Sequence, residues 1–188
     1  MSASREADRA VMGPAEDFAR ASAAIETMIA AVRPDQWEAS TPCTEWNLRQ
    51  LVDHLIEVNY ALAERFGGTR GKPADDPGAG YRQSAQALSN ALALPGVLEQ
   101  TYAGPFAHTT GDRQLQVRMA DLLTHGWDLA RATGVRPDLP ADLVADALGL
   151  VEKLTGAFAR SGKFGTPQPV AADAPVLDKL AALSGRMV

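Results

Sequence analysis

The chain has 188 residues, a length that suits one hydrophobic core better than two. Hydrophobic residues make up 46% and charged residues 22%, as in an ordinary globular protein, and the lone Cys43 excludes an internal disulfide. The net charge of -5, without a basic run, excludes a typical nucleic-acid binder, and the apolar runs are broken well before the roughly 20 residues of a membrane span.

Two helices are predicted in the first third of the chain. Apolar residues at helical spacing predict a helix from Pro14 to Val32, which Pro34 ends. Asn47, with Gln50 three residues later, forms a capping-box pattern that opens a second helix reaching about Phe66, where Gly67 and Gly68 follow. Residues 1–13 contain no apolar run of signal-peptide length and are expected to be disordered.

The middle of the chain alternates irregular segments with helices. Thr69 to Gly80 is dense in Gly, Pro and Asp, so we expect a long mobile loop there, followed by a helix over 81–94. After an irregular stretch over 95–111, a helix is predicted from Asp112 to Thr133, closed by Gly134 at the preferred C-terminal position.

The last third predicts one long helix and a docked tail. A helix begins near Pro140, and its apolar face carries Leu143, Ala147, Leu150, Val151, Leu154 and Phe158. The tail over 162–188 is first irregular and then forms a short helix over 176–183, which docks Leu177, Leu180 and Leu183. Because no long strand pattern occurs, we predict an all-α four-helix bundle with a docked C-terminal tail helix, forming a single domain over 1–188.

The candidate chemistry lies with the histidines, because the chain has no Gly-rich phosphate loop, no CxxC and no nucleophile elbow. Asp121 and His125 stand four apart on one predicted helix, so both side chains can reach one ion. His54 lies at the border of the buried face of another helix. Two imidazoles and a carboxylate leave a coordination position open, as in catalytic zinc sites. His54, Asp121 and His125 therefore either build a divalent-metal site, or are a locally hydrogen-bonded helical pair and a core histidine.

Other residues near these positions have two interpretations each. Glu57 is either a further ligand or hydrogen-bond acceptor at the site, or a solvated surface residue. Asp128 either orients the His125 imidazole or bonds a neighbouring arginine or backbone group. Trp46 and Trp127 are either walls of the site or core residues. Cys43 has no base or cation identifiable in the sequence.

Three sequence blocks resemble a known family. TPCTEWNLRQLVDHL at 41–55 and DLLTHGWDLARATG at 121–134 resemble the DinB-like metal-binding family, which includes the N-terminal domain of mycothiol-dependent maleylpyruvate isomerase. The ending, from Phe164 to the Gly-Arg pair at 185–186, resembles the tail of single-domain members. The resemblance assigns the metal to the same three residues. Glutamate is the usual carboxylate in the isomerase, so we expect Asp121→Glu to preserve or strengthen metal binding.

The resemblance implies a cytoplasmic, metal-dependent enzyme of the mycothiol S-transferase or isomerase type. Zinc suits imidazole and carboxylate ligands best, with nickel and iron as alternatives. A bound low-molecular-weight thiol such as mycothiol would react with an electrophilic small molecule, since a divalent ion lowers the pKa of a coordinated thiol. The alternatives are a hydrolase that uses metal-bound water and a non-catalytic metal-dependent binding protein. A homodimer remains open, and no nucleic-acid or membrane partner is expected.

Overall fold

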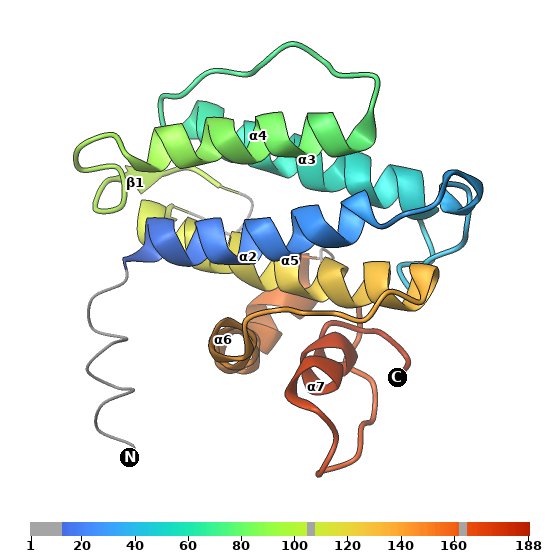
Figure 1. Ribbon diagram of the computed structural model, residues 1–188. Helices are drawn as coiled ribbons and strands as arrows, with labels where there is room; N and C mark the ends of the chain where they lie inside the picture. Colours follow the sequence, from blue (N-terminus) through green and yellow to red (C-terminus); the bar gives the residue numbers. More distant parts are fainter. Residues whose placement is uncertain (1–12, 105–107, 162–164) are drawn as a thin grey trace, which may run out of the picture.

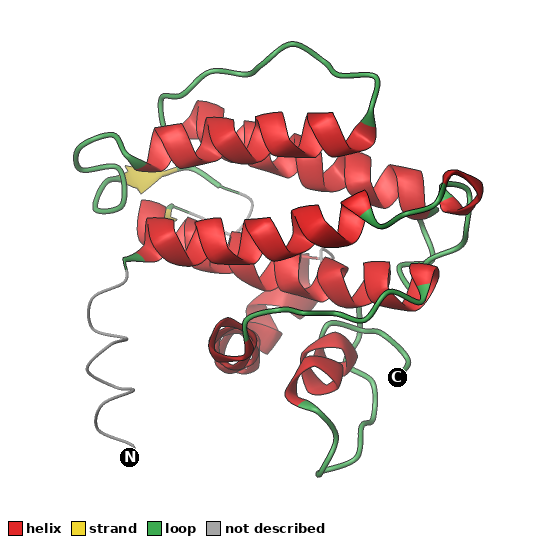
Figure 2. Cartoon of the chain, in the orientation of Figure 1, coloured by secondary structure: helices red, strands yellow, loops and turns green. Residues whose placement is uncertain are grey.

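The computed structural model describes residues 13–104, 108–161 and 165–188, and its regular structure is almost entirely helical (Figure 2). This confirms the all-α prediction. The elements are the helices α2 (Pro14–Ala30), α3 (Leu48–Arg65), α4 (Pro77–Leu92), α5 (Gly111–Thr133), α6 (Ala141–Ser161) and α7 (Val176–Leu183), the 3₁₀ helix η1 (Pro34–Gln36), and the strands β1 (Thr101–Tyr102) and β2 (Thr109–Thr110).

Four helices form the bundle that positions the site. Helix α2 packs against α4 and α5, while α3 packs against α4 and α5, so that each helix has two neighbours (Figure 1). Helices α6 and α7 pack against each other and against α5. The bundle encloses an apolar core that includes Phe18, Ile25, Leu51, Leu55, Leu88 and Leu122. Helix α5 contacts α2 and α3 within the bundle and α6 and α7 outside it. It is therefore the central helix of the fold.

Helix ends follow the predicted capping chemistry. The Asn47 side chain accepts a hydrogen bond from the Gln50 backbone N–H at 2.9 Å, and the Gln50 side chain accepts from the Asn47 N–H at 3.0 Å. Gly134 ends α5 with a left-handed φ of 73°, a conformation that glycine adopts without steric cost. The start of α3 and the end of α5, which flank the candidate ligands, are therefore confirmed as predicted.

Two local predictions were wrong. The segment predicted as a loop to Gly80 already turns into α4 at Pro77, because Asp76 accepts from the Ala79 N–H at 2.7 Å and proline suits the first turn. The stretch predicted as irregular over 95–111 contains a short antiparallel ladder, in which Thr101 pairs with Thr110 and Tyr102 with Thr109.

Some predictions fall outside the part of the chain that the structure describes. These are the disorder of residues 1–12 and the placement of Phe164, together with the side-chain contact of Phe158.

The tail helix matches its predicted bounds, and Leu180 is fully buried. Within the described residues, no helix is long and apolar enough to cross a membrane.

Candidate metal centre

The three predicted ligands come together where α3 faces α5. His54 lies on α3, and Asp121 and His125 lie one turn apart on α5. Oδ1 of Asp121 is 3.4 Å from Nε2 of His125 and 3.7 Å from Nε2 of His54. The two imidazole rings meet edge to face, with centroids 5.1 Å apart. Two imidazole nitrogens from different helices therefore converge on one carboxylate oxygen.

The spacing of these atoms fits a shared metal ion. In a tetrahedral site with bonds of about 2.0–2.1 Å, any two donor atoms lie about 3.3 Å apart. The measured separations from Asp121 are close to that value. Nε2 of His54 is also buried and has no hydrogen-bond partner among the described residues, which is costly unless another group satisfies it. The three residues have the donor types, the spacing and an unsatisfied nitrogen that a divalent ion requires.

Asp121 is oriented by a buried arginine. Arg118, whose side chain is 1% exposed, donates from Nη1 to Oδ2 of Asp121 and leaves Oδ1 facing the imidazoles. The guanidinium also donates to Oδ1 of Asn59 at 2.9 and 3.0 Å and to the Leu55 carbonyl at 3.1 Å. Burial alone would raise the pKa of Asp121, but attraction to His125 and Arg118 outweighs it and holds the pKa well below its usual range.

His125 is oriented from its other nitrogen. Nδ1 lies 2.9 Å from Oδ2 of Asp128, which is completely buried, and Arg186 donates to both oxygens of that carboxylate. Burial alone would lower the pKa of His125, but Asp121 and Asp128 outweigh it and raise the pKa. Both interpretations of Asp128 therefore hold, because it contacts the imidazole and an arginine together.

Trp46 covers the site from the loop that precedes α3. Its indole stacks on His54 with centroids 4.3 Å apart and an interplanar angle of 28°. The buried Thr41 hydroxyl holds this loop by donating to the Trp46 carbonyl at 2.8 Å and the Cys43 carbonyl at 3.0 Å. The structure thus places Trp46 as a wall beside His54, as one of its two interpretations predicted.

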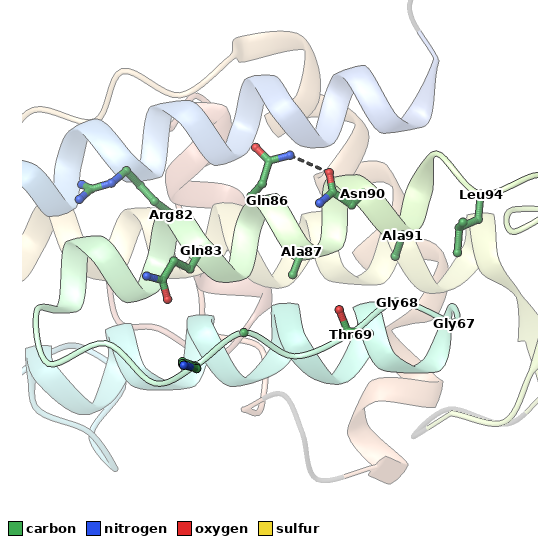
Figure 3. A pocket seen from close by; sticks show the side chains of 12 residues that line it. Gly67, Gly68, Thr69, Arg82, Gln83, Gln86, Ala87, Asn90, Ala91 and Leu94 are labelled. Carbon is green, nitrogen blue, oxygen red and sulfur yellow. Dashed lines mark hydrogen bonds between the residues drawn. The ribbon is translucent and has the colours of Figure 1, made fainter.

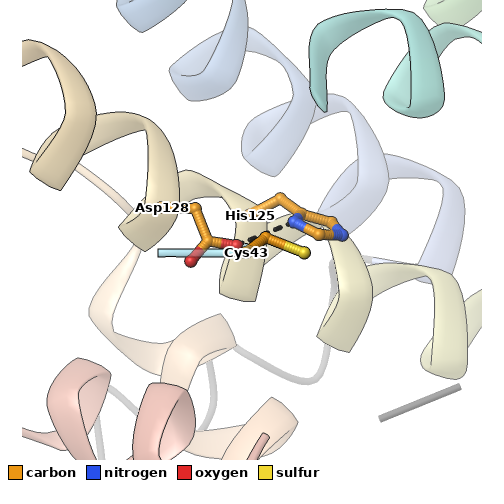
Figure 4. Close-up of side chains that lie close together, drawn as sticks. All are labelled: Cys43, His125 and Asp128. Atoms are coloured by element: carbon orange, nitrogen blue, oxygen red, sulfur yellow. Dashed lines mark hydrogen bonds and ion pairs between the residues drawn. The ribbon is translucent and has the colours of Figure 1, made fainter. Parts of the chain in front are cut away.

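Cys43 lies in the same loop, and the structure places ionisable side chains beside it that the sequence does not identify. Figure 4 shows its side chain beside those of His125 and Asp128. The Cys43 Sγ lies within 4.8 Å of potential ligand atoms of both residues. Burial raises the pKa of the Cys43 thiol, and the positive charge of Arg186 opposes that effect. The loop folds back onto α5, a contact that no sequence motif indicates.

Two predicted site residues lie elsewhere. Glu57 is largely exposed, and its carboxylate accepts from Nη1 of Arg70 at 2.8 and 2.9 Å, so it is a surface residue paired with an arginine. Trp127 donates its indole N–H to Asp178 of α7 at 2.7 Å, with the guanidinium of Arg131 over the ring, so it anchors the tail instead. His108 is an exposed residue in the bend before β2, outside the site.

Three further polar residues, Arg118, Asn59 and Arg186, organise the site and were not among the predicted site residues. Arg118 stands one turn before Asp121, a spacing that could have indicated the contact. Asn59 faces Arg118 from α3, and Arg186 reaches Asp128 from 58 residues away. No local pattern connects either pair. Such contacts depend on how the helices pack.

A separate groove of about 700 Å³ lies between α4 and the segment that follows α3 (Figure 3). Gly68, Lys72, Arg82 and Asn90 are among the residues that line it. None of the three candidate ligands contributes to its walls. The groove is therefore distinct from the candidate metal centre.

An all-α bundle that gathers two histidines and a carboxylate from facing helices defines a helical-bundle protein with a candidate metal centre. Residues 18–93 match the family described as the mycothiol maleylpyruvate isomerase N-terminal domain. The chain belongs to this family. The matched segment contains His54 and Trp46.

Relatives extend the similarity over nearly the whole chain. The uncharacterized protein Rv0738 of Mycobacterium tuberculosis (strain ATCC 25618 / H37Rv) is 33% identical over 181 residues, which cover 94% of this chain and all of that protein. The uncharacterized protein MT0763 of strain CDC 1551 / Oshkosh gives the same values. No solved structure gives a significant match.

Proposed function

We propose that this protein is a metal-dependent enzyme that presents a low-molecular-weight thiol, such as mycothiol, to an electrophilic small molecule. The observation that carries the proposal is the unpartnered, buried Nε2 of His54, which faces Oδ1 of Asp121 across from His125. The family match adds the link to mycothiol-related chemistry and small-molecule substrates. In the proposed site His54, Asp121 and His125 are the metal ligands.

The donor set favours zinc. Imidazole and carboxylate ligands suit zinc, and three protein ligands with a fourth position left to an external group are typical of catalytic zinc sites. His54 and Asp121 keep about a quarter of their side-chain surface exposed (27% and 23%), whereas His125 keeps 6%. An external ligand would therefore approach from the side of His54 and Asp121. Nickel and iron remain alternatives for the same donors.

A divalent ion in this position lowers the pKa of a thiol bound to it, so that the reactive thiolate forms near neutral pH. The protein's residues perform the positioning. Arg118 directs Oδ1 of Asp121 toward the imidazoles, and Asp128 holds the Nδ1 side of His125. Trp46 covers one face of His54 and excludes water from that side. The cytoplasm, where low-molecular-weight thiols stay reduced, is the proposed compartment.

The test is cobalt substitution followed by thiol titration. Cobalt(II) replaces zinc in such sites and gives an intense thiolate charge-transfer band when a sulfur ligand binds. We expect this band when mycothiol is added to the cobalt protein, and no band when the thiol is replaced by its S-methyl derivative. His54→Ala should lose both the metal and the band, whereas His108→Ala, which changes an exposed histidine outside the site, should keep both.

The competing functions give different results in the same experiment. A hydrolase would turn over small esters or amides without added thiol and would give no thiolate band. A non-catalytic binding protein would bind metal and small molecules without turnover in either assay. If mycothiol gives no thiolate band in fully metal-loaded protein, the thiol-presenting function is contradicted. The proposed metal site would still stand.

A further inference from the structure

The buried carboxylate of Asp128 connects the C-terminal tail to His125. Asp128 on α5 has no exposed surface, and its carboxylate lies between two groups. On one side is Nδ1 of His125 at 2.9 Å, and on the other is Arg186, whose Nη2 donates at 2.8 Å and Nε at 3.2 Å. Both oxygens of this carboxylate therefore interact with Arg186, and one of them also contacts the His125 imidazole.

The tail holds the Arg186 guanidinium in place. Its Nη1 donates to the Ser184 carbonyl at 2.8 Å, and its backbone N–H donates to the Ala181 carbonyl at 3.0 Å. Gly185 adopts a left-handed φ of 93°, and a Cβ there would lie 2.5 Å from the Cα of Gly165, so a glycine is required. The turn that carries Arg186 is thus fixed by its own backbone and by a close chain crossing.

This arrangement determines which nitrogen of His125 carries the proton. An ionised Asp128 accepts hydrogen bonds, and its oxygen is 2.9 Å from Nδ1, whereas Oδ1 of Asp121 is 3.4 Å from Nε2, so the geometry favours the neutral imidazole with its hydrogen on Nδ1. The lone pair is then on Nε2, which faces Asp121 and the His54 side of the site. Arg186 balances the buried charge of Asp128, because a carboxylate without solvent or a cation would otherwise be neutralised.

We propose that Arg186 is a positioning residue of the metal centre, which acts through Asp128 to present the Nε2 lone pair of His125. The inference rests on the proposed function, because it assigns a role to that same site. The C-terminal tail would then contribute a positioning residue to a site whose proposed metal ligands all lie on α3 and α5. Partners that fix a ligating histidine usually change metal affinity by roughly 10–100-fold when they are removed.

The test compares Arg186→Met with Arg186→Lys and with the matched control Arg20→Met. Arg20 also forms a bidentate pair between two elements, donating to Asp142 at 2.8 and 2.9 Å, but it has no contact with the site residues. We expect zinc affinity, measured by competition with a chelator, to fall roughly 10–100-fold in Arg186→Met and less in Arg186→Lys. Arg20→Met should match the wild-type protein.

Two further readouts separate positioning from folding. At alkaline pH, where the His125 imidazole is neutral, nitrogen-15 NMR of the metal-free protein should show the Nδ1–H form of His125 in the wild type and a mixture of tautomers in Arg186→Met. The double variant Arg186→Met with Asp128→Asn removes both charges and should restore thermal stability. Its zinc affinity should stay at least roughly 10-fold weaker than that of the wild type, because an amide can donate to Nδ1 or accept from it and so no longer fixes the tautomer.

The outcomes distinguish this inference from the proposed function. If folded Arg186→Met binds zinc within about threefold of wild type and keeps the single tautomer, Arg186 has only a structural role and the inference is overturned. Recovery of full affinity in the double variant has the same meaning. If the wild type binds no metal while the NMR shows the tautomer shift, the proposed function fails and only the positioning of His125 by Arg186 stands.

Discussion

Oδ1 of Asp121 lies 3.4 Å from Nε2 of His125, one turn further along the same helix. Residues four apart on a helix face the same side, so the backbone of α5 alone brings these donors together. The packing of α3 against α5 adds His54 on the other side of the same oxygen, at 3.7 Å. Oδ1 of Asp121 thus faces His125 of its own helix and His54 of α3 together.

The first prediction concerns metal content. Purified protein should carry about one divalent ion per chain, and His125→Ala or His54→Ala should lose it, because each removes one of three ligands. His108→Ala is the matched control, since this histidine is exposed and outside the site. Elemental analysis after dialysis against a chelator and reloading with zinc measures the result. Equal metal content in all three variants would remove the basis of the proposed site.

The second prediction is that zinc raises the thermal stability of the fold. A ligand that binds only the folded state at 100 times its dissociation constant stabilises it by about 2.7 kcal/mol. For a chain of this size that corresponds to a rise in Tm of roughly 5–10 °C. Calorimetry with and without zinc measures the shift. It should vanish in His54→Ala and persist in His108→Ala, and a shift of equal size in both variants would assign zinc to another site.

The third prediction concerns the buried partner of Asp121. Arg118→Met should reduce the free energy of unfolding by about 3–5 kcal/mol, because it leaves Asp121 without its cation and Asn59 without its donor. The control is Arg33→Ala, since the Arg33–Asp35 pair is exposed and such pairs contribute about 0–1 kcal/mol. Urea unfolding of the metal-free proteins measures both. Similar losses in the two variants would contradict the buried role of Arg118.

Local patterns in the sequence predicted the parts of the site that depend on one helix. The spacing of Asp121 and His125 and the capping box at Asn47 follow from neighbouring residues, and the structure has both. His54 was predicted because it borders an apolar face. The pairing of Asp128 with Arg186 spans 58 residues and has no periodic signal, so only the packed tail reveals it.

Trp127 and Glu57 lie away from the site for similar physical reasons. Trp127 stands beside the ligands in the sequence, but two residues along a helix is about 200°, so its side chain leaves α5 toward α7. Glu57 is one turn from His54, yet Arg70 binds its carboxylate at the surface. Proximity in sequence was a poor guide in both cases, because the helix face and the available partners determine the contact.

The fourth prediction concerns alkaline pH. Burial raises the pKa of Tyr81 to about 12, against about 10 in an unfolded chain. The folded state therefore keeps the phenol proton longer, and this contribution is complete below pH 10 and lost as pH rises toward 12. The loss amounts to about 2–3 kcal/mol.

Tyr81→Phe removes this titration, so its free energy of unfolding should fall less steeply than that of wild type between pH 10 and 12. The variant also loses the hydrogen bond between Tyr81 and Ser22, which shifts the whole curve but does not change its slope there. Tyr102→Phe, a half-buried tyrosine, serves as the control. Parallel curves for wild type and Tyr81→Phe would contradict the raised pKa.

The last prediction reverses an expectation from the sequence. Glutamate is the usual carboxylate in the resembling isomerase, so Asp121→Glu was expected to preserve or strengthen metal binding. In the structure the shorter side chain already places Oδ1 3.4 and 3.7 Å from the two imidazole nitrogens. Arg118, fixed by Asn59 and the Leu55 carbonyl, holds the other oxygen. An added methylene has to displace either the shared oxygen or this arginine.

We therefore expect Asp121→Glu to weaken zinc binding, though less than His125→Ala, because charge and donor type are kept while the geometry is strained. Asp121→Asn is the matched control, since it keeps the length and removes the charge. Competition with a chelator ranks the three variants, and circular dichroism checks that each is folded. Zinc affinity equal to or above wild type in Asp121→Glu would show that the helices adjust to the longer arm, so that the distance between α3 and α5 does not select aspartate.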